Sequence, residues 1–263
     1  THHLAEEVRE FLARPAPGWP RVSESHEPEI LGTGGGLVAA RPLLGEQPFI
    51  LVNGDVAATD DLRPLLAQLA SEQALAVLGV VDDQRFNSVG LGDGRRVAGF
   101  RGDHGLPPNA SMLTYSGLAA IHPGLLDYLP ANGFSSLVEA FRAAIADGKK
   151  ILAHPLAGYW DDLGTPDRLL RLNLELAAGR RESLAALLPP GAGSIHPRAR
   201  VGPDANLQGV CLLGDGAVVA DGAVVADSLL LPGAVVRAGV TVKDAVLGDG
   251  FVAKQDIQGG AHA

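Results

Sequence analysis

Two short acidic segments carry the side chains best suited to chemistry in this sequence. Asp55 comes three residues after the end of an apolar run at residues 49–52, so a carboxylate stands where a buried strand is expected to emerge. Asp161 and Asp162 are adjacent in a loop that leads into a helix. One aspartate from each segment, converging on one point, would form a Mg²⁺ site whose remaining ligands are substrate phosphates and water. The first segment also fits a plain turn, and the second also fits a solvated loop.

A glycine-rich stretch, residues 32–36, is a third candidate. Glycines there would let the backbone approach a flat base or a phosphate without a Cβ in the way. A glycine-rich turn has little specificity by itself, so its meaning depends on the segments around it.

The elements that must position these residues are visible in the pattern of apolar residues. Strands are predicted at residues 49–52 and 74–81, and helices at residues 4–12, 61–72 and 137–146. A further helix is predicted to begin at Pro166, with Thr165 as its N-cap and Gly179 just past its end. This alternation predicts an α/β domain with a largely parallel sheet over residues 1–188.

A different period begins after the linker-like residues 187–193. An aliphatic residue returns every sixth position, which predicts a short left-handed parallel β-helix of hexapeptide repeats over residues 194–256. Arg237 and Lys243 fall on expected inward positions and predict a frayed last coil. Open backbone edges on an end coil favour a homo-oligomer formed through the β-helix. The repeating positions are Ile195, Val201, Leu207, Leu213, Val219, Val225 and Leu231.

Composition excludes several classes of function. The chain has 263 residues, 46% of them hydrophobic, which suits one large domain or a large domain with a smaller companion. A net charge of −9 without a basic stripe makes nucleic acid an unexpected partner. The single cysteine, Cys211, excludes an intrachain disulfide and a cysteine-based zinc site. We expect no membrane span and a cytoplasmic location, because no apolar stretch is long enough and no signal opens the chain.

Three motifs occur in one order along the chain and are followed by the hexapeptides. In that arrangement they resemble the sugar-1-phosphate nucleotidyltransferases, and among these the mannose-1-phosphate guanylyltransferases. The resemblance implies a Rossmann-like nucleotidyltransferase domain that transfers a nucleoside monophosphate from a nucleoside triphosphate to a sugar 1-phosphate and releases pyrophosphate. The motifs are Glu27-Pro28-Glu29-Ile30-Leu31-Gly32-Thr33-Gly34-Gly35, Val52-Asn53-Gly54-Asp55 and Trp160-Asp161-Asp162-Leu163-Gly164-Thr165-Pro166.

The resemblance also implies roles for individual residues. Asp55 and Asp162 would be catalytic and hold Mg²⁺ between the nucleotide and the sugar phosphate, with Asp161 as a spare carboxylate. Thr114 and Gly117, in a Thr-Tyr-Ser-Gly segment, would bind the sugar phosphate. The implied nucleotide-binding residues are Glu27, Gly32, Thr33, Gly34, Gly35, Asn53 and Gly54.

Glu27 stands where members of this family place a side chain that reads the base. Its acceptor-only oxygens suit the adjacent N–H donors of guanine, which favours GTP and, with the guanylyltransferase likeness, mannose 1-phosphate. The single ring N–H of uracil or thymine is the alternative.

Two departures from the family pattern limit these expectations. No segment matches the family's opening GGxGTRLxPLT loop with its Pro-Lys, so we expect an N-terminally truncated domain that is inactive as it stands. The family's Glu-Lys-Pro segment is absent between residues 97 and 108, which leaves the sugar open. The alternatives are a non-catalytic subunit that binds a nucleotide sugar and regulates, and a hexapeptide acyltransferase that uses His196.

Overall fold

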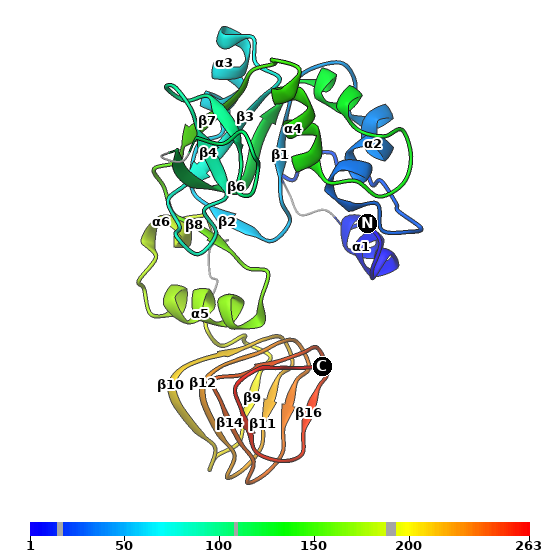
Figure 1. Cartoon of the computed structure of the whole chain (residues 1–263). Coiled ribbons are helices and arrows are strands. Elements are labelled where there is room, and N and C mark those ends of the chain that lie inside the picture. The colour runs from blue at the N-terminus through cyan, green and yellow to red at the C-terminus, as the bar shows by residue number, and fades with distance from the viewer. Residues whose placement is uncertain (15–17, 108–109, 188–192) are drawn as a thin grey trace. The chain divides into compact units, whose positions relative to one another are not determined.

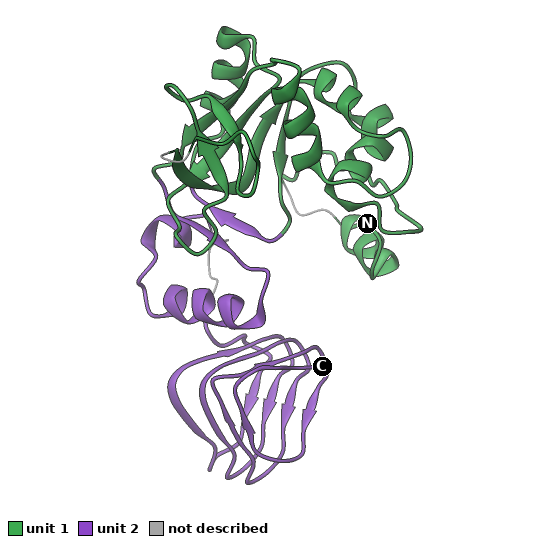
Figure 2. Ribbon diagram, viewed as in Figure 1, with its two compact units in different colours: residues 1–54, 60–157 green, residues 55–59, 158–263 purple. Residues whose placement is uncertain are grey.

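The computed structural model of the chain describes residues 1–14, 18–107, 110–187 and 193–263 (Figure 1). It divides into two compact units (Figure 2). Unit 1 comprises residues 1–54 and 60–157, and unit 2 comprises residues 55–59 and 158–263. The predicted linker at residues 187–193 includes residues 188–192, which lie outside the described residues.

Unit 1 is built on a six-stranded mixed sheet with the order β5-β4-β6-β3-β7, in which β1 also pairs with β6. One edge of the long strand β6 is shared by β4, at residues 111–113, and by β1, at residues 118–121. The opposite edge of β6 pairs with β3. The strands are β1 (Phe49–Val52), β3 (Ala76–Val81), β4 (Val89–Leu91), β5 (Val97–Phe100), β6 (Ser111–Ile121) and β7 (Ile151–Pro155).

The prediction of a largely parallel sheet is wrong for the strands that the structure describes. Only β3 and β7 run parallel, and every other pair in this sheet is antiparallel. Alternating strands and helices give parallel neighbours when a helix connects them. Here β4, β5 and β6 follow one another without a helix, so the chain returns beside itself in the opposite direction.

Helices cover both faces of this sheet. The helices α2 (Gly32–Leu44), α4 (Leu137–Ala146) and η1 (Pro123–Tyr128, a 3₁₀ helix) pack on one face, and α3 (Arg63–Glu72) packs on the other. Side chains alternate along a strand, so successive residues of β3 point into the hydrophobic cores on opposite faces of the sheet. Leu78 packs in the core that contains Phe141, and Val77 packs in the core that contains Leu65. The predicted helices are confirmed, including α1 (Ala5–Leu12) near the start of the chain.

Unit 2 begins with a two-stranded antiparallel ribbon and a helix. The ribbon consists of β2 (Val56–Ala58) and β8 (Trp160–Asp162). The helix α5 (Pro166–Ala177) is capped as predicted, because the Thr165 side chain accepts a hydrogen bond from the Arg168 amide and a left-handed Gly179 follows the helix. A short helix, α6 (Glu182–Ala185), comes next, and α5 packs on the solenoid through Leu170.

The rest of unit 2 is a parallel β-solenoid, which confirms the predicted β-helix. Val218 pairs with Val235 and Val235 pairs with Val252, so each central coil takes 17 residues. The strands are β9 (Arg200–Val201), β10 (Asn206–Leu213), β11 (Val218–Val219), β12 (Val224–Leu230), β13 (Val235–Val236), β14 (Thr241–Lys243), β15 (Val246–Leu247), β16 (Val252–Ala253), β17 (Ile257–Gln258) and β18 (Ala261–His262).

The fraying predicted at Arg237 and Lys243 is wrong. One side of each central coil has five residues instead of six, so the inward positions move one residue earlier than a strict six-residue count places them. The shortened corner holds a left-handed aspartate in successive coils, Asp227 and Asp244. Arg237 is therefore exposed and Lys243 only half-buried. The large aliphatic residues that take the repeating inward position after Val225, all fully buried, are Leu230, Val236, Val242 and Leu247.

Candidate functional site

The β2–β8 ribbon of unit 2 brings Asp55 and Asp162 together. Val56 is paired with Asp162, and the Leu163 N–H donates a 2.7 Å hydrogen bond to the Asp55 carbonyl. A Cβ built on Gly164 would lie 2.9 Å from Asp162 Oδ1 and 3.4 Å from Asp55 Oδ2. Two carboxylate oxygens therefore flank one point, which is left open because residue 164 is glycine.

This pair of oxygens suits a hard divalent cation, which prefers carboxylate ligands. The Gly164 N–H donates a 2.7 Å hydrogen bond to Asp162 Oδ1, while Asp162 Oδ2 lies 3.5 Å from Arg168 Nη1. Asp55 is exposed. Across the described ranges, no three His, Cys, Asp or Glu side chains are grouped so as to hold a metal. A cation bound by Asp55 and Asp162 would take its other ligands from substrate and water.

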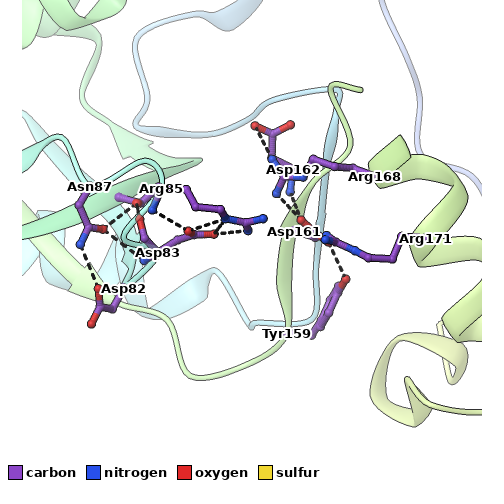
Figure 3. Close-up of polar contacts among 10 residues, drawn as sticks. Asp82, Asp83, Arg85, Asn87, Tyr159, Asp161, Asp162, Arg168 and Arg171 are labelled. Carbon is purple, nitrogen blue, oxygen red and sulfur yellow. Dashed lines mark hydrogen bonds and ion pairs between the residues drawn. The ribbon is translucent and has the colours of Figure 1, made fainter. Parts of the chain in front are cut away.

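Asp161, directly before the candidate ligand, is the centre of a buried polar network (Figure 3). Its side chain is 9% exposed and forms ion pairs with Arg168 and, at 2.7 Å, with Arg171. The Tyr159 hydroxyl donates to the same carboxylate at 3.2 Å. Burial alone would raise the pKa of Asp161, but hydrogen bonds from Arg168 and Arg171 outweigh it and leave that pKa lowered. Burial, with the charge of Asp161, raises the pKa of Tyr159 to about 12.

The network fixes the backbone that carries Asp162. The Asp162 N–H donates a 3.0 Å hydrogen bond to Asp161 Oδ1, and the arginines that hold Asp161 come from the first two turns of α5. Asp161 is thus fully engaged within unit 2, where it joins β8 to α5, and it is not a spare carboxylate. Sequence reasoning missed Arg168 and Arg171; the available signal was two arginines three residues apart on the helix that follows the acidic pair.

The predicted glycine-rich segment lies in unit 1 and forms the first turn of α2, not a turn before a helix. The Gly34 N–H donates a 2.8 Å hydrogen bond to the Ser135 carbonyl. A Cβ on Gly34 would lie 2.7 Å from Leu129 Cδ2, and one on Gly35 would lie 2.5 Å from the Gly133 carbonyl oxygen. Gly32 has a φ of +71°, a left-handed conformation. The start of α2 therefore packs directly against the segment before α4.

Thr33 and Glu27 also have partners inside unit 1. Thr33 Oγ1 accepts a 3.0 Å hydrogen bond from the Leu137 amide, one of the unpaired donors at the start of α4. Glu27 Oε2 accepts a 3.0 Å hydrogen bond from the Leu31 amide. These contacts explain both residues within the fold, and contact with a nucleotide stays a prediction for them and for the glycines.

The remaining predicted residues of unit 1 lie on β6 and at the end of β1. The Asn53 N–H donates a 2.9 Å hydrogen bond to the Gly117 carbonyl. Gly117 has a φ of +80°, and a Cβ on it would lie 2.8 Å from Asn53 Nδ2, so the structure brings these two together. Gly54 is exposed beside Asn53. Thr114 is 3% exposed, and its hydroxyl donates to Asn87 Oδ1 at 2.8 Å, so it is occupied within the fold.

His196, the candidate base of an acyltransferase, lies on the first coil of the solenoid. Its Nδ1 accepts a 3.2 Å hydrogen bond from the Arg198 amide. Its side chain is 42% exposed, in contrast to the buried side chains inside the coil.

A protein-family model for nucleotidyl transferases matches residues 1–179, which is more than half of the sequence. The chain belongs to the nucleotidyl transferase family, and the membership expected from the three motifs is confirmed.

Relatives within this family differ in the nucleotide and the sugar that their names state. The chain is 32% identical to mannose-1-phosphate guanylyltransferase of Mycobacterium tuberculosis over 203 residues, which cover 75% of the chain and 55% of the relative. It is 30% identical to N-acetylmuramate alpha-1-phosphate uridylyltransferase of Neisseria meningitidis over 162 residues, 56% of the chain and 64% of the relative. The chain thus spans about half to two thirds of the length of these curated relatives.

A solved structure shares the fold. UDP-glucose pyrophosphorylase from Acinetobacter baumanii superposes with a TM-score of 0.52 at 20% identity, covering 70% of this chain and 69% of that one. Among the helices that the structure describes, none is long and apolar enough to cross a membrane.

Proposed function

We propose that this chain is part of an enzyme that transfers a nucleoside monophosphate from a nucleoside triphosphate to a sugar 1-phosphate, with Asp55 and Asp162 holding Mg²⁺. The observation that carries the proposal is the convergence of these two carboxylates at Gly164. Membership of the nucleotidyl transferase family supports it. The cation would neutralise phosphate charge during in-line attack of the sugar phosphate oxygen on the α-phosphorus.

The chain's own residues have distinct tasks in this reaction. Asp55 and Asp162 present their carboxylates from adjoining positions of the backbone, because the ribbon holds the two segments together and Asp161 anchors β8 to α5. The backbone around Gly117 and Asn53 offers a close approach to the sugar phosphate, and the segment from Glu27 to Gly35 binds the base and ribose. GTP and mannose 1-phosphate are the proposed pair, supported by the acceptor oxygens of Glu27 and by the guanylyltransferase among the relatives. We also propose a cytoplasmic location and self-association through the solenoid.

The test separates metal binding from turnover. Binding of Mg²⁺, or of Mn²⁺ followed by electron paramagnetic resonance, is measured on this chain and on its Asp55→Asn and Asp162→Asn variants. Both substitutions should weaken binding at least about tenfold, because each removes one of two charged ligands. Asp167→Asn, in the first turn of α5, is the matched control and should bind as the unchanged chain does.

Turnover is then measured as Mg²⁺-dependent pyrophosphate release by the protein that contains this chain, with GTP or UTP and mannose 1-phosphate. Loss of release in Asp55→Asn and a preference for GTP would support the proposal. Full metal affinity in both carboxylate variants would overturn the metal assignment. Binding of GDP-mannose without any pyrophosphate release would favour the non-catalytic regulatory subunit.

A further inference from the structure

A polar cavity of about 560 Å³ lies within unit 1, between α3, the turn that connects β4 to β5, and β7. None of the residues predicted to bind nucleotide, sugar or metal lines it. Its volume is in the range of small-ligand sites. The polar residues that face it include Gln68, Glu72, Asp93, Arg95, Arg96 and His154.

The turn that carries the two arginines is tied to β7. The Ala153 N–H donates a 2.7 Å hydrogen bond to the Arg95 carbonyl, and Arg96 forms an isolated antiparallel bridge with Leu152. The Arg96 guanidinium is engaged, since Nη2 donates a 3.0 Å hydrogen bond to the Gly148 carbonyl. Arg95 lines the cavity, and no ion pair of its guanidinium is found within the described part of the chain. The backbone of Arg95 is therefore held beside the cavity, and its exposed side chain is available to a ligand.

His154 faces the same cavity in an oriented state. Its Nδ1 lies 2.8 Å from Gln68 Oε1, a contact that holds the ring and leaves Nε2 for another partner. Burial, followed by the charge of Arg95, lowers the pKa of His154, while the charge of Asp60 opposes this shift. A neutral imidazole next to an uncompensated guanidinium gains a proton readily once an anion sits between them.

The acids and bases that line the cavity balance, with Glu72 and Asp93 against Arg95 and Arg96, so the positive charge is local to the Arg95 side. Lys150 Nζ lies 3.7 Å from Glu72 Oε2 and offsets that carboxylate. Asp93 is the remaining acid of the lining, and it opposes the arginines. A ligand with negative charge and several acceptor oxygens fits the Arg95 and His154 donors, because guanidinium groups match phosphate oxygens in geometry and charge.

We propose that this cavity binds a small phosphate-type anion through the guanidinium of Arg95 and the imidazole of His154. Free inorganic phosphate, pyrophosphate and the phosphate of a larger metabolite share this chemistry. The site stands independently of the proposed metal pair, since it uses no residue of the β2–β8 ribbon.

Calorimetric titration of the chain with inorganic phosphate, and separately with pyrophosphate, tests the site without Mg²⁺. Arg95→Gln should weaken binding at least about tenfold, because a charge-assisted pair is lost. Asp93→Asn should tighten binding about threefold, because it removes the opposing charge. Arg63→Gln, which removes an exposed arginine that pairs with Asp61 at 2.7 Å, is the matched control and should have no effect.

The pH dependence gives a second readout. Affinity should rise as the pH falls from about 8 to about 6, because protonation of His154 adds a donor, and His154→Gln should flatten that rise. Of inorganic phosphate and pyrophosphate, the one whose affinity falls more in Arg95→Gln is the better match to the ligand of this site. Equal affinity in the unchanged chain and in Arg95→Gln, or no saturable binding below about 10 mM, would overturn the proposal. Asp162→Asn should bind the anion as the unchanged chain does, and this result would not depend on whether the proposed reaction is correct. Loss of anion binding in Asp162→Asn would instead assign the anion to the metal site.

Discussion

The glycine-rich start of α2 in unit 1 and the β2–β8 ribbon in unit 2 both carry residues predicted to contact substrate, but they use those residues differently. At the start of α2, Gly34 and Gly35 are buried against the segment before α4, and a side chain at either position would meet atoms closer than 3.0 Å. In the ribbon, Asp55 is exposed and Asp162 half-buried. Packing alone therefore accounts for the glycines, whereas the contacts of Asp162 with the Gly164 amide and Arg168 do not account for a second carboxylate, Asp55, at the same point.

The same contrast occurs between two adjacent residues of β8. Asp161 is buried and contacts two arginines and a tyrosine, so its negative charge is neutralised by partners within the fold. Asp162 has an oxygen beside that of Asp55. Of these two neighbouring acids, one is thus engaged by the fold and the other is the proposed metal ligand.

The largest expected effect comes from adding a methyl group at Gly35. The Cβ of Gly35→Ala would lie 2.5 Å from a backbone carbonyl oxygen, which cannot move without shifting the segment before α4. We expect a loss of about 2–3 kcal/mol in the free energy of unfolding of unit 1. Gly36→Ala is the matched control, because its Cβ meets only the end of the flexible Glu27 side chain and alanine favours a helix by up to about 1 kcal/mol. Equal losses in urea unfolding of the two variants would refute the packing role of Gly35.

Asp161→Asn should lower the free energy of unfolding by a similar or slightly smaller amount. This change leaves Arg168 and Arg171 without the carboxylate that they share. Removing one partner of a buried ion pair costs about 3–5 kcal/mol, and we expect about 2–3 kcal/mol here because Arg171 is 46% exposed. Asp162→Asn should change the free energy of unfolding by less than about 0.5 kcal/mol, as surface substitutions do. Thermal unfolding of both variants measures the contrast, and a larger loss in Asp162→Asn would reverse the roles assigned to the two acids.

The smallest effect is a change in the pH dependence of stability. The pKa of Asp161 is lowered in the folded chain, so its contribution is complete above the ordinary carboxyl value of 3.8 and is lost as the pH falls through the folded pKa. The difference in unfolding free energy between the unchanged chain and Asp161→Asn should therefore be constant from about pH 7 to 5 and shrink in more acidic solution. A difference that stays constant down to about pH 2 would show that the carboxylate charge contributes nothing.

Local signals in the sequence were sufficient for much of the fold. Thr165, Pro166 and Gly179 act within one or two turns of their own helix, and the hexapeptide period repeats the same packing rule at every coil. The antiparallel course of β4, β5 and β6 was missed because β4 and β5 are three and four residues long, too short for a clear period. The five-residue side of each coil was missed because aspartate, and not glycine, takes the left-handed corner at residues 227 and 244.

Some features of the candidate site could likewise be predicted from the sequence, and others could not. The acidic residues could be found from the ends of apolar runs and from the family motifs. The pairing of β2 with β8 joins segments about a hundred positions apart, and three-residue strands carry no signal for that partner. The spacing of the two arginines on α5 was a weak signal for the contacts with Asp161, because those contacts depend on where α5 lies against the ribbon.

The 17-residue coil has a consequence for how this part of the molecule can change in length. In the central coils each strand residue pairs with the one 17 residues away, so this part of the solenoid tolerates the loss or gain of a whole circuit, which returns every later residue to the same face. Removal of a single hexapeptide would instead rotate all later residues by one face of the coil and would place the corner aspartates within a side. Insertions and deletions in this region should therefore preserve the packing only when they add or remove one complete coil.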